Sequence, residues 1–151
     1  MTSPSYTLFF DEAFNQAKLA GVRGETPVGA VIVYKNEIIA QAGNHTREFC
    51  DPTAHAEVIA IRQACKILSS ERLVDCDLYV TLEPCTLCAA AISFARIKRL
   101  YFCAPDVKGG AVENGVCFFN TPTCHHSPDI YGGFREEEAR DLLKDFFKQR
   151  R

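Results

Sequence analysis

The sequence predicts a single three-layer α/β/α domain around a mixed five-stranded sheet. Two observations indicate this fold class. Apolar runs of strand length alternate with stretches whose apolar residues recur at helical spacing, from residue 28 to the C-terminus. The 151 residues are enough for one hydrophobic core but not for two, and no repeat, low-complexity tract or Gly/Ser linker divides them. We therefore expect residues 1–151 to form one domain.

The N-terminal part is expected to form a helix and then a hairpin. Apolar side chains share one helical face between residues 6 and 20, and Gly21 and Gly24 follow as stop signals. Residues 28–34 form an apolar, β-branched run, and residues 37–42 are predicted to form a second strand after a Lys-Asn turn.

The middle of the chain alternates helix and strand. Residues 55–68 carry one apolar stripe at helical spacing, and residues 78–82 form a short apolar strand. Residues 85–97 are helical and apolar almost all round, as expected for a buried helix, and residues 100–103 form another strand. Because a helix separates these two strands, we expect them to be parallel and joined by a right-handed crossover.

The C-terminal part is irregular before it ends in a helix. Glycine and proline occur throughout residues 104–134, within which residues 130–131 are the candidate for a short fifth strand. Residues 117–128 receive no assigned role. An amphipathic terminal helix is predicted by apolar residues at i, i+3, i+4, i+7 and i+8, namely Ala139, Leu142, Leu143, Phe146 and Phe147.

Composition and charge narrow the class of protein. The chain is 47% hydrophobic and 24% charged, as in ordinary globular proteins, which argues against disorder. No run of about 18 apolar residues exists, so a transmembrane helix is excluded. Residues 1–6 lack the basic start and apolar stretch of a signal peptide, so we expect a cytoplasmic protein. The net charge of −2 does not by itself indicate RNA binding.

Eight cysteines are expected to be reduced thiols, because no export signal points to an oxidising compartment. Only Cys85 and Cys88 are closely spaced, which makes this pair a candidate metal site. The other six are interpreted as buried small hydrophobic residues: Cys50, Cys65, Cys76, Cys103, Cys117 and Cys124.

Two short segments, His55-Ala56-Glu57 and Pro84-Cys85-Thr86-Leu87-Cys88, carry the candidate chemistry. Each lies where a loop enters a helix, and a helix N-terminus favours thiolate over thiol. Two thiolates and one imidazole select zinc over magnesium or calcium. Three protein ligands without an obvious fourth predict a catalytic zinc that keeps one position for water. Glu57 is then placed to exchange protons with that water.

A structural zinc site is the plainer alternative. Its fourth ligand would come from Cys124, His125 or His126, the other Cys/His cluster in the chain. The spacing of His55 and Glu57 would then serve no purpose. A related hypothesis is a non-catalytic zinc module that only binds RNA.

At these residues the sequence resembles the zinc-dependent nucleobase deaminases, whose signature joins His-x-Glu to Pro-Cys-x-x-Cys. Longer stretches are similar to the bacterial tRNA-specific adenosine deaminase family, and the resemblance covers nearly the whole chain. They are Pro27–Val31, Asn44, Asp51–Glu57, Tyr79–Cys85, Ala104–Gly110 and Asp145–Arg151.

The resemblance implies a cytidine-deaminase-like fold, one Zn²⁺ per chain and hydrolytic deamination of adenosine to inosine at the wobble position of tRNA, by a homodimer. His55, Cys85 and Cys88 would bind zinc, and Glu57 would shuttle protons. Contacts with the base, its flanking nucleotides and the anticodon loop would come from Val28, Asn44, Ala56, Asp106 and Phe147.

A small-molecule deaminase acting on guanine, cytosine or a nucleoside is the alternative interpretation. A riboflavin-pathway deaminase is disfavoured, because the chain leaves no room for a reductase domain. Two basic clusters support an RNA substrate only if they lie on the same side as the metal site or if a dimer joins them. One contains Arg96, Lys98, Arg99 and Lys108, and the other contains Lys144, Lys148, Arg150 and Arg151.

Overall fold

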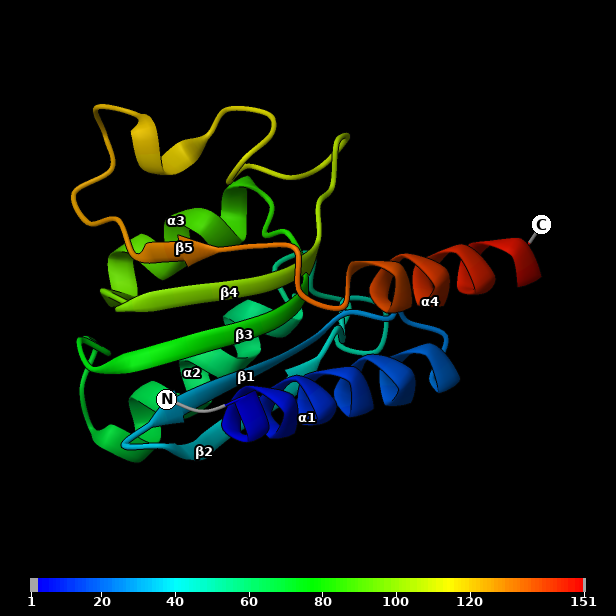
Figure 1. Cartoon of the computed structure of the whole chain (residues 1–151), viewed down its shortest axis with the longest axis horizontal. Helices are drawn as coiled ribbons and strands as arrows, with labels where there is room; N and C mark the ends of the chain where they lie inside the picture. The colour runs from blue at the N-terminus through cyan, green and yellow to red at the C-terminus, as the bar shows by residue number, and fades with distance from the viewer. Residues whose placement is uncertain (1–2, 151) are drawn as a thin grey trace.

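A five-stranded mixed sheet forms the middle layer of the computed structural model, which describes residues 3–150 (Figure 1). The strand order is β2-β1-β3-β4-β5. β1 is antiparallel to both of its neighbours, whereas β3, β4 and β5 run parallel to one another. The strands are β1 (Gly29–Tyr34), β2 (Glu37–Gly43), β3 (Cys76–Leu82), β4 (Arg99–Ala104) and β5 (Asp129–Tyr131).

Two pairs of helices cover the two faces of this sheet (Figure 1). α2 (Ala56–Leu68) and α3 (Thr86–Ala95) pack on one face, where one apolar core lies. α1 (Ser3–Val22) and α4 (Glu136–Gln149) cover the other face over a second core. The three-layer architecture and the parallel pairing of β3 and β4 are therefore confirmed.

The alternation of side chains along the strands explains how one short chain builds both cores. Leu78 and Val80 of β3 enter the core under α2 and α3, and Tyr79 between them enters the core under α1. The ring of Tyr79 stacks on that of Tyr101 of β4, with centroids 4.4 Å apart. A strand buried on both faces reads as a continuous apolar run, which is what the sequence has here.

Helix and turn boundaries show where local chemistry decides the chain path. Lys35 and Asn36 both have positive φ, 50° and 65°, as the tight turn of the predicted hairpin requires. The helix predicted over residues 85–97 ends at Ala95 instead. Arg96 takes the left-handed conformation, and the N–H groups of Arg96 and Ile97 bond back to the last turn of α3. Because glycine usually occupies that position, the sequence did not reveal this stop. α1 likewise continues through Gly21, which was expected to end it.

One edge of the sheet gathers the residues singled out from the sequence. β3 and β4 end at this edge, and the antiparallel β1 begins there, next to the end of β2. Val28 before β1, Asn44 after β2 and Asp106 after β4 therefore lie at the same edge as Cys85 after β3.

Within residues 3–150, no helix combines the length and the apolar character needed to cross a bilayer. Met1 and Thr2, which belong to the segment searched for a signal peptide, and Arg151, which belongs to the second basic cluster, lie outside the described residues 3–150.

All eight cysteines are free in the structure. Cys76 and Cys103 are buried, and Cys65, Cys117 and Cys124 are partly buried. Cys50 is exposed, so its interpretation as a buried residue is wrong. It lies in the loop between β2 and α2, away from both cores.

Candidate active site

The N-termini of α2 and α3 meet at the candidate metal site. His55 is the N-cap residue of α2, Cys85 is the N-cap residue of α3, and Cys88 follows in the first turn of α3. His55 Nδ1 lies 3.5 Å from the Sγ atom of Cys85 and 3.4 Å from that of Cys88. The ligand atoms of all three residues lie within 4.8 Å of one another.

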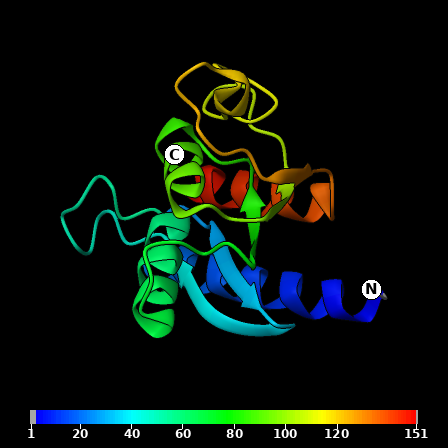
Figure 2. The ribbon, with the colours of Figure 1, turned by 90° about the vertical axis from the view of Figure 1, so that its left-hand side faces the viewer.

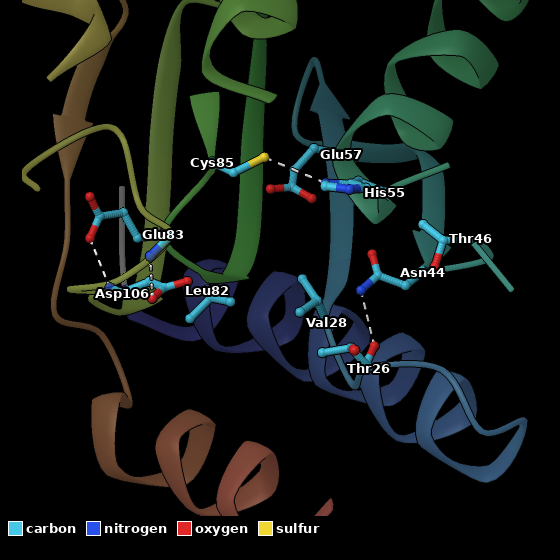
Figure 3. Close-up of a pocket in the computed structure, with 11 residues that line it drawn as sticks. Thr26, Val28, Asn44, Thr46, His55, Glu57, Leu82, Glu83, Cys85 and Asp106 are labelled. Carbon is cyan, nitrogen blue, oxygen red and sulfur yellow. Dashed lines mark hydrogen bonds between the residues drawn. The ribbon is translucent and has the colours of Figure 1, made fainter. Parts of the chain in front are cut away.

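These separations fit a zinc ion. Tetrahedral zinc, with bonds of about 2.3 Å to sulfur and about 2.0 Å to nitrogen, places those ligand atoms about 3.5 Å apart. Neither N-cap side chain bonds to its own helix, although N-cap side chains commonly do. His55 and Cys85 thus leave their helix ends uncapped and turn toward each other (Figure 3).

The two thiols differ in their tendency to ionise. The hydrogen bond with the Cys88 thiol, reinforced by the one with His55, lowers the pKa of Cys85 to about 4. The pKa of the Cys88 thiol is raised, because it shares that hydrogen bond and is buried. The hydrogen bond with Cys85 raises the pKa of His55, and a bond to the backbone of Pro52 adds to this. A bound cation would favour the thiolate form of both cysteines, because metal ligands must be deprotonated.

Glu57 lies beside the three candidate ligands without joining them. Its carboxylate lies near His55 and Cys85 (Figure 3) and is only 4% exposed. Burial, with a contribution from the charge of Cys85, raises the pKa of Glu57 to about 7. A carboxyl group with a pKa near neutrality can both accept and return a proton, as general acid–base catalysis requires.

A cavity of about 260 Å³ opens in front of this group (Figure 3). Its walls come from the edge of the sheet described above and from the two helix starts. It is lined by Thr26, Val28, Asn44, Thr46, His55, Glu57, Leu82, Glu83, Cys85, Asp106 and Gly109.

Asn44 connects the cavity wall to α2. Its Oδ1 accepts the N–H of Ala56 at 2.8 Å, and its Nδ2 donates to the carbonyl of Thr26 at 3.1 Å. An amide nitrogen carries two hydrogens, so one donor of Asn44 is left for a ligand. The N–H of Ala56 is already bonded to Asn44, and Ala56 is fully buried and does not line the cavity.

The other predicted contact residues divide between two hollows. Val28 and Asp106 line the cavity, and Asp106 Oδ1 also accepts the N–H of Gly109 at 2.9 Å. Phe147 does not line it. Phe147 is half exposed and lines a neighbouring hollow of about 330 Å³, whose wall also includes Asp106 and Leu82.

The interpretation from sequence missed two buried glutamates, Glu83 and Glu25. Glu83 accepts five hydrogen bonds from the loop after β4. Their donors are the backbone N–H groups of Asp106, Val112, Glu113 and Asn114 and the side-chain amide of Asn114. Burial alone would raise the pKa of Glu83, but these bonds lower it. The one hint in the sequence to a role for Glu83 was its position directly before Pro84 and the predicted metal ligand Cys85.

Glu25 holds the loop on the opposite side of the cavity. It is 1% exposed and accepts the backbone N–H groups of Arg47 and Glu48 and the hydroxyl of Thr46. Burial opposes ionisation of Glu25, but the three hydrogen bonds prevail and lower its pKa. No spacing pattern in the sequence marks this residue.

The second Cys/His cluster does not reach the candidate metal site. Cys124 Sγ bonds to the carbonyl of His126 and contacts Ser93 Oγ at 3.5 Å, and His126 Nε2 contacts the carbonyl of Ile97 at 2.7 Å. Among residues 3–150, the ligand atoms that converge are those of His55, Cys85 and Cys88. A closed structural site with a fourth ligand from this cluster is therefore not supported.

The first basic cluster meets the condition for RNA binding only in part. Arg96, at the end of α3, and Arg99, at the start of β4, lie at the opposite edge of the sheet from the cavity, and Arg99 pairs with Asp77 at 3.0 Å. Lys108, however, lines the hollow beside the cavity, and so does Arg140 of α4, which belongs to neither predicted cluster.

Comparison with known proteins agrees with this geometry. The family model described as the cytidine and deoxycytidylate deaminase zinc-binding region matches residues 4–104. A tRNA-specific adenosine deaminase of Agrobacterium fabrum is 58% identical over 145 residues, which cover 96% of this chain and 95% of the relative.

Solved structures resemble it as well. A structure from a study of A-to-I editing by tRNA:A34 deaminases at the wobble position of transfer RNA is 59% identical, with a TM-score of 0.90 over 91% of this chain and 99% of that one. A guanine deaminase of Bacillus subtilis is 34% identical, with a TM-score of 0.66 over 99% of this chain and 94% of that one.

Proposed function

Because the chain belongs to the cytidine and deoxycytidylate deaminase family, and within it to the tRNA-specific adenosine deaminases, we propose that it deaminates adenosine to inosine at the wobble position of tRNA. The observation that carries this proposal is the convergence of His55, Cys85 and Cys88 beside the buried carboxylate of Glu57, at the floor of a cavity. Adenosine and water are consumed, and inosine and ammonia are released.

His55, Cys85 and Cys88 would hold one zinc ion. Zinc supplies Lewis acidity there, which lowers the pKa of water from about 15.7 towards about 7. Glu57 takes a proton from the attacking water and delivers it to N1 of the purine, and then assists the departure of the amine. Its pKa of about 7 suits both directions of transfer.

The cavity walls orient the base. The free N–H of Asn44 donates to a ring acceptor, and Val28 packs against the apolar face of the base. Asp106, at the rim, faces the sugar-phosphate of the target or its neighbour, and Phe147 lies at the adjoining hollow where a flanking nucleotide fits. An unpaired base in an anticodon loop enters such a site at a lower unstacking cost than a paired one.

We further propose that the protein acts as one catalytic domain, in a homodimer, in the cytoplasm. Leu87 and Phe94 of α3 are 39% and 72% exposed, and exposed apolar side chains of this size are common where a second subunit packs. Light scattering in solution measures the oligomeric state directly, and a monomer at all concentrations would contradict the dimer.

The decisive experiment uses a tRNA with adenosine at the wobble position. Digestion to nucleosides after incubation should show inosine formed in proportion to adenosine lost. A parallel assay of ammonia release from free guanine, cytosine and adenosine tests the small-molecule alternative, which the likeness to the guanine deaminase raises. Release from a free base without inosine in the tRNA would favour that alternative. Elemental analysis should find one zinc per chain.

A further inference from the structure

The segment from Asn44 to Asp51 projects from the body of the molecule beside the cavity. It is the blue-green loop that extends to the left in Figure 2. Asn44 and Thr46, near its start, line the cavity. The loop therefore continues the cavity wall outward, to where the remainder of a large substrate would lie.

Hydrogen bonds hold this loop in one conformation despite its exposure. The buried carboxylate of Glu25 accepts three hydrogen bonds from residues 46–48. Within the loop, the N–H of Phe49 bonds to the carbonyl of His45 at 2.9 Å, and the N–H of Asp51 bonds to the carbonyl of Thr46 at 3.0 Å. These hydrogen bonds fix the backbone of the loop and therefore the positions from which its side chains project.

Two aromatic rings on the loop stack on each other. The rings of His45 and Phe49 are nearly parallel, at 9°, with centroids 4.5 Å apart. Both nitrogens of His45 have partners, Arg23 Nη2 and Glu48 Oε2, each at 3.0 Å. Phe49 rests on this fixed imidazole and is nevertheless 54% exposed. An aromatic ring fixed in this way and left in water is a platform for stacking.

Two arginines flank the aromatic pair. A hollow of about 660 Å³ next to the loop is lined by Arg23 and Arg47, with Gly24, Glu25 and Glu48. Arg47 Nη1 donates to the carbonyl of Gly24 at 3.2 Å, which orients its guanidinium and leaves further donors free. The carboxylate of Glu48 is already engaged by His45 and lies 3.9 Å from Arg23. Arg23 Nη2 also donates to the carbonyl of Asn44 at 3.0 Å, so the unengaged donors that the hollow offers to an anion are mainly those of Arg47.

We propose that this loop binds a nucleotide adjacent to the target adenosine in the RNA strand, with its base stacked on Phe49 and its phosphate at Arg47 and Arg23. The inference rests on the proposed function, because only a polynucleotide supplies a neighbouring base and phosphate. Stacking on an aromatic ring accepts any base, and phosphate contacts carry no sequence information. The loop should therefore contribute affinity and register, and leave the choice of target base to the cavity.

The chain contains no tryptophan, so Phe49→Trp introduces a single fluorophore at the proposed contact. The probe is an anticodon stem-loop RNA with adenosine at the wobble position, added to the variant in a Glu57→Gln background so that it is not consumed. Saturable quenching of the emission is expected.

The matched control is Ile67→Trp, which places the fluorophore at the far end of α2, where the native side chain is 59% exposed. Unquenched emission from the Phe49→Trp variant, at RNA concentrations that saturate turnover by the wild-type protein, would overturn the proposal, and so would equal quenching of the control.

Kinetics provide a second, independent test. Phe49→Ala should raise KM for the stem-loop about tenfold and leave kcat within about twofold, while Phe49→Tyr keeps KM near the wild-type value. Arg47→Gln should lower the salt dependence of binding by about one counterion. Ile67→Ala should change none of these quantities. If the wild-type protein deaminates the stem-loop and Phe49→Ala matches it, the subsite is wrong and the proposed function stands. If the wild-type protein does not deaminate the RNA, the proposed function itself fails.

Discussion

The backbone N–H of Asp106 donates a hydrogen bond of 2.9 Å to Oε1 of Glu83, and this bond joins the loop after β4 to the segment that carries Cys85 (Figure 3). Four further donors from residues 112–114 bind the same carboxylate. Glu83 therefore fixes the position of Asp106 at the cavity, although its own side chain is buried under the loop.

Glu83→Gln tests this relationship. The substitution places an amide N–H against N–H donors, so at least one buried donor loses its acceptor. We expect a loss of about 1–3 kcal/mol in stability. The deaminase activity should fall through a higher KM, because Asp106 shifts at the cavity rim. Thermal unfolding and steady-state kinetics measure the two effects. Glu113→Gln, an exposed change in the same loop, is the control and should behave like the wild type.

Gly110→Ala tests how closely the loop after β4 packs against Glu83. A Cβ on Gly110 would lie 2.5 Å from the carboxyl carbon of Glu83 and 2.5 Å from the carbonyl oxygen of Asp106. Backbone on one side and a carboxylate held by five hydrogen bonds on the other leave no room for it. We expect clear destabilisation in thermal unfolding. Gly109→Ala should cost less, because its Cβ would meet only the end of the Asp106 side chain, at 3.0 Å. Equal losses for the two variants would contradict this account of the loop.

Glu25 should contribute stability that depends on pH. Hydrogen bonds from Arg47, Glu48 and Thr46 overcome the effect of burial and hold its pKa below the ordinary value of 4.5. For a carboxylate with a lowered pKa in the folded state, the stabilisation is present above the pKa of the unfolded chain and is lost as the pH falls through the folded pKa.

The comparison of wild type with Glu25→Gln isolates this contribution. In denaturant unfolding, the stability difference between the two should be constant near neutrality and should shrink as the pH drops below about 4.5. A difference that stays constant down to about pH 3 would show that Glu25 is not the titrating group.

The parts of the site that depend on local geometry were predictable from the sequence. The spacing of Cys85 and Cys88 predicts that both lie on one side of the first turn of α3. His55 lies 30 residues before Cys85, and its convergence with the two cysteines was predicted from its place at a second helix start and from the motif that joins the two segments. Glu25 and Glu83 were not predictable in the same way. Their partners lie more than 20 residues further along the chain, and nothing in a one-dimensional pattern pairs a carboxylate with a distant loop. The end of α3 was missed because Arg96 occupies a position where glycine is usual.

The proposed roles of Glu57 and Cys88 are separated by a pair of variants. Glu57→Gln keeps the shape of a residue that is not among the convergent ligand atoms, so zinc content and thermal stability should stay near wild type. Turnover should fall by about 10²- to 10⁴-fold, because the amide cannot move the proton.

Cys88→Ala removes a buried thiol from the three candidate zinc ligands, so zinc and stability should be lost together. Elemental analysis, thermal unfolding and inosine formation measured on the same two samples check all three quantities. Full zinc retention by Cys88→Ala would refute the ligand assignment, and unchanged turnover by Glu57→Gln would remove Glu57 from the mechanism.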